Sequence, residues 1–220
     1  MNQPNLVRWI ISLLLCGACV LPLSAQDADG QKKASAVKSD DKKPSDRDMM
    51  AMMMEMAKPN ENHQRMQKLV GTWSYTTKWW MSPDAPPNES AGTTVTKSVM
   101  DGRYLLSDHT GKMQMPGPDG KPMDMEFKGM AIEGYDNAKK KYVASWIDNM
   151  GTGIMNLEGT YDRAAKTLTY LADYEPMPGM KTKIKEVMTW VDNDHHRLEF
   201  FEDRGGKEVR TMQIEYSRKS

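Results

Sequence analysis

The feature that most restricts the fold is a series of alternating apolar and polar segments that fills the chain from residue 72 almost to its end. About ten of these segments have the length and the period of two that strands require. They span residues 72–81, 91–100, 103–112, 125–135, 140–149, 153–161, 166–174, 182–192, 196–203 and 207–217. Turn-forming residues such as Asp101-Gly102 and Arg204-Gly205-Gly206 separate them. The pattern predicts an all-β protein.

Successive strands joined by short turns pair antiparallel, and closing a sheet of about ten strands removes its exposed edges. We therefore predict an antiparallel up-and-down β-barrel, with a two-sheet sandwich as the alternative architecture. The stretch from Met113 to Met123 is rich in Pro and Gly and is predicted to be a loop. A short helix over 61–70, capped by Asn60, is predicted to precede the first strand.

The first 25 residues have the pattern of a secretory signal peptide. Arg8 gives a positive start, residues 9–23 are almost wholly apolar, and Leu23-Ser24-Ala25 offers a small residue at a cleavage point. The apolar run is too short for a comfortable membrane span. We predict an exported protein, periplasmic or secreted, with no membrane span after cleavage.

Both cysteines, Cys16 and Cys19, lie inside this leader. The remaining chain therefore has no disulfide and no thiol chemistry, and its stability must come from a packed core. Small residues before Cys19 leave a lipoprotein anchored at that cysteine as an alternative.

Three further regions follow the leader. Residues 26–48 are polar and contain one sizeable apolar residue, so we predict a disordered linker. Residues 49–59 form a methionine-rich arm that ends at Pro59 and favours a short helix. Residues 60–220 form the barrel domain. A formal net charge of zero gives no basic excess for nucleic-acid binding.

Several phrases resemble a bacterial family known as domain of unknown function 1579, over roughly residues 60 to 217. They are His63-Gln64-Arg65, Leu69-Val70-Gly71-Thr72-Trp73, Asp101-Gly102-Arg103-Tyr104-Leu105, Gly134-Tyr135-Asp136-Asn137 with Lys141-Tyr142, Trp146-Ile147-Asp148 and Glu158-Gly159-Thr160-Tyr161. A short helix leading into Gly-x-Trp also resembles lipocalins and fatty-acid-binding proteins. The resemblance implies a lipocalin-like barrel and no established activity.

Alternation places mixed aromatic, apolar and acidic side chains on the faces predicted to line the barrel. Apolar walls with a few polar groups suit a small apolar or amphipathic ligand, although the same aromatics could simply fill a core. The candidate ligand-binding residues are Trp79, Tyr142, Trp146, Asp148, Glu186, Met188 and Trp190. We expect Trp73 to plug one end beneath the helix. Binding is expected at the opposite mouth, around Trp146, Asp148 and Trp190.

Methionine is unusually abundant, with 21 residues. Thioethers are soft ligands for Cu(I), so envelope metal handling is an alternative function. The candidate ligands are Met49, Met50, Met52, Met53, Met54 and Met56. Flexible apolar contact is the competing interpretation of these residues.

Motifs for catalysis or cofactor binding are missing from the sequence, which has no His-Glu-x-x-His, no Gly-x-Ser-x-Gly and no phosphate-binding Gly-rich loop. We predict no cofactor. An enzyme stays a second alternative, with Asp148, Glu158, Glu186 and His109 as acid/base candidates. Asp192-Asn193-Asp194-His195-His196 is interpreted as a polar turn.

Overall fold

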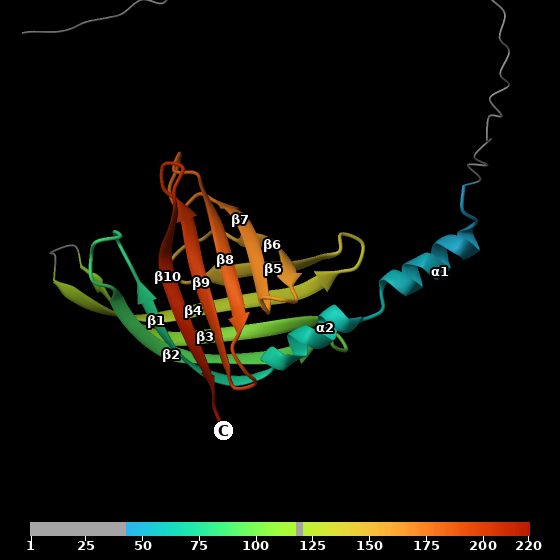
Figure 1. Cartoon of the computed structure of the whole chain (residues 1–220), viewed down its shortest axis with the longest axis horizontal. Helices are drawn as coiled ribbons and strands as arrows, with labels where there is room; N and C mark the ends of the chain where they lie inside the picture. Colours follow the sequence, from blue (N-terminus) through green and yellow to red (C-terminus); the bar gives the residue numbers. More distant parts are fainter. Residues whose placement is uncertain (1–42, 118–120) are drawn as a thin grey trace, which may run out of the picture. The chain divides into compact units, whose positions relative to one another are not determined.

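A computed structural model describes residues 43–117 and 121–220, and these contain two α-helices, one 3-10 helix and ten strands (Figure 1). The helices are α1 (Asp46–Met56), α2 (Glu61–Met66) and the 3-10 helix η1 (Gln67–Leu69). The strands are β1 (Gly71–Trp79), β2 (Asn88–Val99), β3 (Tyr104–Pro116), β4 (Pro122–Asp136), β5 (Lys141–Asp148), β6 (Met155–Asp162), β7 (Thr167–Tyr174), β8 (Thr182–Trp190), β9 (His195–Asp203) and β10 (Glu208–Arg218).

The ten strands form a closed antiparallel barrel. Each strand pairs with its neighbours in sequence, and β1 pairs with β10 to close the ring. In that closing pair Trp73 lies opposite Arg218 and Trp79 lies opposite Met212. The predicted all-β, up-and-down barrel preceded by a short helix is confirmed, and the sandwich is not formed.

One predicted loop is mostly strand. β3 continues to Pro116 and β4 begins at Pro122, with Met113 opposite Met125 and Met115 opposite Met123. The prediction of a loop over 113–123 was wrong because apolar and polar residues keep alternating there. The two prolines stand at the last pair of the ladder, where a missing backbone N–H costs little.

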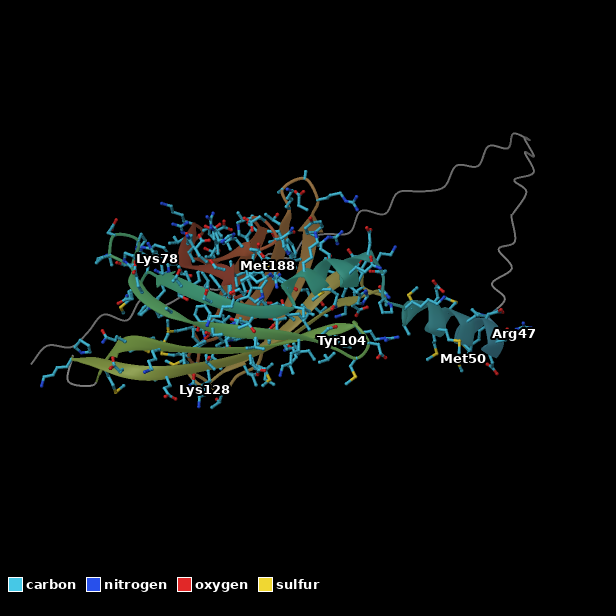
Figure 2. All side chains as sticks on the ribbon, turned by 90° about the horizontal axis from the view of Figure 1, so that it is seen from below. Arg47, Met50, Lys78, Tyr104, Lys128 and Met188 are labelled. Carbon is cyan, nitrogen blue, oxygen red and sulfur yellow. The ribbon has the colours of Figure 1, made fainter. Side chains whose placement is uncertain are left out.

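α1 begins at Asp46, three residues before the predicted start of the methionine-rich arm and inside the predicted linker. Ser45 caps it, and Asp48 completes the capping box. None of its residues is buried, and Figure 2 shows Met50 on this exposed helix. The predicted leader, with Cys16 and Cys19, and most of the predicted linker lie outside the described residues. None of the helices in the described part of the chain is long and apolar enough to cross a membrane.

α2 and η1 cover the end of the barrel at which β1 begins. Met66 and Leu69 are buried and pack into the same core cluster as Leu105, Tyr142 and Leu168. Trp73 is 3% exposed, and its indole N–H donates to the Leu69 carbonyl over 2.8 Å. This is the plugging position predicted for Trp73. We call this the helix-covered end.

Arg218 joins the last strand to this covering segment. Its guanidinium donates to the carbonyls of Val70 (2.8 Å) and Lys68 (2.7 Å) and lies 4.0 Å from the centroid of the Trp73 ring. A Cβ atom on Gly71 would lie 2.5 Å from Arg218 Nη1, and Gly71 has a φ of 136°. Residue 71 is therefore glycine for two reasons, the close approach of Arg218 and the backbone angle.

Candidate functional site

The barrel interior differs between its two ends. At the helix-covered end the inward-facing side chains are packed, with Tyr142 at 2% and Leu168 at 1% exposure. Toward the other end the inward-facing Phe127, Trp146 and Phe200 are only partly buried. These residues lie toward the end that α2 and η1 do not cover, so their remaining surface faces that mouth or the space behind it. We call this part of the interior the open half.

Trp146 is the main aromatic surface of the open half. Its ring stacks with Phe127 at a centroid distance of 6.3 Å and meets His109 edge-on at 5.0 Å. Its indole N–H donates to Asp148 over 2.7 Å, and the other oxygen of Asp148 accepts the backbone N–H of Met150. The carboxylate thus fixes the indole orientation by a charge-assisted hydrogen bond.

Glu133, Tyr170 and Glu186 form a polar group midway along the barrel. Glu186 is 9% exposed and Tyr170 is 3% exposed, and Glu133, on the inward face of β4, is partly buried. Burial raises the pKa of Glu133 to about 7, and the nearby Tyr170 hydroxyl partly opposes that shift. Burial, followed by the negative charge of Glu133, raises the pKa of Glu186 to about 8.

In the described part of the chain, these three side chains have no hydrogen-bonding or ionic partner outside their own group. The Tyr170 hydroxyl lies near Glu133, but it is buried without a hydrogen bond of good geometry. Neither carboxyl forms an ion pair with any described lysine or arginine. Buried polar groups are normally partnered. Trp190 Nε1 and His196 Nδ1 are also buried without a hydrogen bond among the described residues, but neither belongs to a cluster with two carboxyls.

The inward-facing histidines are neutral. His109 shares a 2.9 Å hydrogen bond with Thr94, and burial lowers its pKa to about 4. His196 stacks on Tyr216 with ring centroids 4.3 Å apart, and burial lowers its pKa to about 3. Among the described residues, neither of these histidines forms a hydrogen bond or ion pair with a carboxylate.

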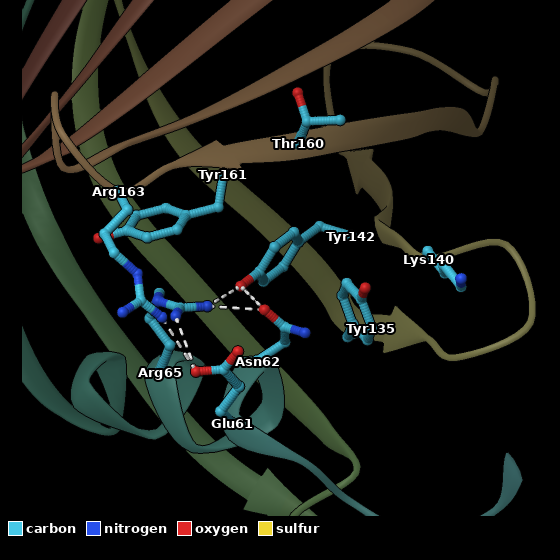
Figure 3. Close-up of a pocket in the computed structure, with 9 residues that line it drawn as sticks. All are labelled: Glu61, Asn62, Arg65, Tyr135, Lys140, Tyr142, Thr160, Tyr161 and Arg163. Carbon is cyan, nitrogen blue, oxygen red and sulfur yellow. Dashed lines mark hydrogen bonds and ion pairs between the residues drawn. The ribbon is translucent and has the colours of Figure 1, made fainter.

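A surface pocket of about 340 Å³ lies at the helix-covered end, beside α2 (Figure 3). Arg65 donates to Tyr142 (2.6 Å) and Asn62 (2.7 Å) and lies 4.1 Å from the centroid of the Tyr161 ring. Glu61 pairs with Arg163 over 3.2 Å. The dashed contacts in Figure 3 connect Glu61, Asn62 and Arg65 of α2 with Tyr142 and Arg163 of the barrel, so this group of residues attaches α2 to the barrel.

The structure separates the seven predicted ligand-binding residues. Trp79, Trp146 and Asp148 lie in the open half, and Glu186 and Met188 lie deeper, with Met188 part of the packed core. Tyr142 is packed beneath α2. Trp190 packs edge-on against Tyr161 at 5.5 Å, also at the helix-covered end.

Two positional predictions were wrong. Trp190 does not share a mouth with Trp146 and Asp148, because β8 runs toward the helix-covered end while β5 runs away from it. Glu158 is not an interior acid/base candidate. It lies on the outer face, where it accepts a 2.8 Å hydrogen bond from Lys139. His195 and His196 also diverge: His195 contacts Asp192 in the turn at 2.9 Å, whereas His196 is buried.

Sequence reasoning missed Glu133, Tyr170 and Phe127. All three obey the alternation that identified the other interior residues, since Phe127 and Glu133 share the inward face of β4 and Tyr170 lies opposite Glu186. Applying the same two-residue period to every strand would have found them.

Comparison with known proteins agrees with the fold. A family model described as "Protein of unknown function (DUF1579)" matches residues 58–218. The crystal structure of Rv2717c from M. tuberculosis is similar with a TM-score of 0.50 and 14% identity, covering 74% of this chain and 100% of that one. A de novo designed fluorescence-activating β-barrel has a TM-score of 0.37 and 14% identity, covering 70% of this chain and 95% of that one. Among curated proteins, none is significantly similar to the chain.

Proposed function

The chain belongs to the DUF1579 family, whose description gives no activity, and we propose that it is an exported protein that binds a small apolar or amphipathic molecule in the open half of its barrel. One observation carries this proposal. Inward-facing aromatic side chains in the open half keep accessible surface, although the barrel around them is closed.

The chemistry of the open half suits an amphipathic ligand. The faces of Trp146 and Phe127 offer apolar surface, and covering such surface is worth about 25 cal/mol per Å². Asp148 and His109 lie at the same level of the barrel, and Glu133 and Glu186 lie deeper. Apolar walls with a few polar groups are the usual composition of a ligand site.

Dye binding tests this function. N-phenyl-1-naphthylamine is a neutral, apolar dye that fluoresces when it leaves water, and we expect saturable binding to the protein. Ala144→Phe adds a ring to the inner face of β5, and Ser145→Phe adds the same ring to the outer face of that strand. The inner variant should weaken dye binding at least about tenfold, which corresponds to about 1.4 kcal/mol, while the outer variant should not.

Circular dichroism of both variants shows whether they remain folded, since an added ring in a packed core typically costs about 1–3 kcal/mol of stability. If the dye shows no saturable binding, or if both variants weaken it equally, the open half is not a binding site.

A second function is supported by the methionines of α1. Met49, Met52, Met53 and Met56 have the i, i+3, i+4 and i+7 spacing that puts them on one helix face, and their exposures run from 39% to 67%. Accessible thioethers on one face could bind Cu(I). Changing these four residues to Leu in the full chain should abolish Cu(I) binding in competition with a chromogenic chelator. Unchanged binding would exclude α1 from metal handling.

A further inference from the structure

We propose that the ligand carries a positively charged nitrogen, which lies between Glu133, Glu186 and the Tyr170 hydroxyl while its apolar part lies against Trp146. This inference rests on the proposed function and adds the chemical class of the ligand. It concerns primary amines with an apolar tail, and it argues against fatty acids and other anions.

The first support is the convergence of the three side chains from different strands. β4 and β8 are four positions apart in the ring of ten, so Glu133 and Glu186 project from nearly opposite walls. Tyr170 lies beside Glu186 in the pairing of β7 with β8. Its ring lies over Gly159 on β6, where a Cβ atom would come within 2.6 Å of Tyr170 Cδ1. The absence of a side chain at Gly159 lets Tyr170 lie along the wall, with its hydroxyl toward Glu133.

The second support is that the three groups have acceptor capacity and no donor from the rest of the described chain. Tyr170 is only 3% exposed, and its hydroxyl has no well-formed hydrogen bond. Neither carboxyl has an ion pair among the described residues. An alkylammonium group has three N–H donors, and two carboxylates with one hydroxyl oxygen offer three acceptors. The ligand's charge would also offset the cost of burying two carboxylates.

The third support is the sign of the charge along the path to this group. Asp148 adds a carboxylate in the open half, and His109, whose ring contacts Trp146 there, is neutral because burial lowers its pKa to about 4. An anionic head group would therefore meet carboxylates and, among the described residues of the interior, no positive charge that offsets its own. A cation would be attracted to the carboxylates and to the face of Trp146.

Displacement of N-phenyl-1-naphthylamine by three compounds of equal chain length tests the inference. At pH 8.5, octylamine should displace the dye at a concentration at least about tenfold lower than 1-octanol, and octanoate should be the weakest. In the Glu133→Gln/Glu186→Gln protein, octylamine should lose this advantage, measured as the ratio of its displacing concentration to that of 1-octanol in the same variant. Glu158→Gln, which changes a carboxylate on the outer face, is the matched control and should keep it.

The outcomes separate the two proposals. Absence of dye binding overturns the proposed function together with this inference. Dye binding without a preference for octylamine, or a preference that survives in the double variant, overturns only this inference. The single variants Glu133→Gln and Glu186→Gln supply the same comparison if the double variant does not fold.

Discussion

Trp146 lies directly over Gly129 on the neighbouring strand: a Cβ atom on residue 129 would be 2.4 Å from Cη2 of the indole. The indole can lie flat against the wall of the open half only because residue 129 has no side chain. The width of the interior at this level therefore depends on one glycine.

Gly129→Ala should push the Trp146 indole into the interior. We expect a shift in tryptophan fluorescence, weaker dye binding and a loss of about 1–3 kcal/mol of stability from the steric conflict. Gly151→Ala is the control, because a Cβ atom there meets nothing within 4 Å. Equal dye affinity in both variants would show that the indole position does not control the site.

Arg218→Ala should weaken the attachment of the segment 68–70 to the helix-covered end of the barrel. The variant loses the guanidinium's hydrogen bonds to the carbonyls of Val70, Lys68 and Asn193 and its contact with the Trp73 ring, so we expect about 1–3 kcal/mol of destabilisation in urea denaturation. Arg218→Lys keeps the charge but loses the planar fork, and it should recover only part of the loss. Wild-type stability of the alanine variant would contradict this role.

Stability should fall as the pH rises from about 6.5 to 8. Burial raises the folded-state pKa of Glu133 to about 7 and of Glu186 to about 8, against 4.5 for ordinary glutamate. The folded protein thus binds more protons than the unfolded chain in this range, and each carboxyl contributes a loss of at most about 1.4 kcal/mol per pH unit. Denaturation at several pH values should show this slope.

The Glu133→Gln/Glu186→Gln protein is the control for this pH dependence and should show a flatter profile. The other groups that interact with these carboxyls are Tyr170 and Tyr216, whose pKa values are raised by burial, so they stay neutral. Below pH 6.5 the depressed pKa values of His109 and His196 add a slope of opposite sign, because the unfolded histidines bind protons there, and this offsets the slope of the two carboxyls. A rise in stability between pH 6.5 and 8 would show that the carboxyls are not buried as described.

Export predicts a specific N-terminus. Expression in a bacterial host with a secretion pathway should give a protein that begins after Ala25, as read by intact-mass spectrometry of the periplasmic fraction. A mass increased by a lipid, lost on Cys19→Ser, would support the lipoprotein alternative. An uncleaved chain in the cytoplasm would contradict both.

The fold could be predicted from the sequence because the alternation of apolar and polar residues within each strand indicates its inner and outer faces. Leu157, Glu158 and Gly159 illustrate this: alternation puts Glu158 outside, as the structure shows, although its carboxylate made it a candidate for an interior acid. Even the placement of Trp190 follows from strand order. In a meander that starts at the helix-covered end, every even-numbered strand ends there, and Trp190 ends β8.

The polar group at mid-barrel is harder to predict. It depends on the direction that the Tyr170 side chain takes over Gly159. It also requires that two glutamates far apart in the sequence lie at the same depth in the barrel. The two-residue alternation within a strand predicts which face of the sheet a residue lies on. Depth depends on the register of all ten strands, which is a property of the closed barrel.

The pairing of β1 with β10 also determines when the barrel can close. The first strand has no partner on one side until the last residues, including Arg218, have left the ribosome. Barrels whose closure joins distant parts of the chain fold slowly, because most of the loop entropy is lost before the final contacts form. Closure of the barrel is therefore the last folding step that the order of synthesis allows, and the earlier strands wait for it as an open sheet with two free edges.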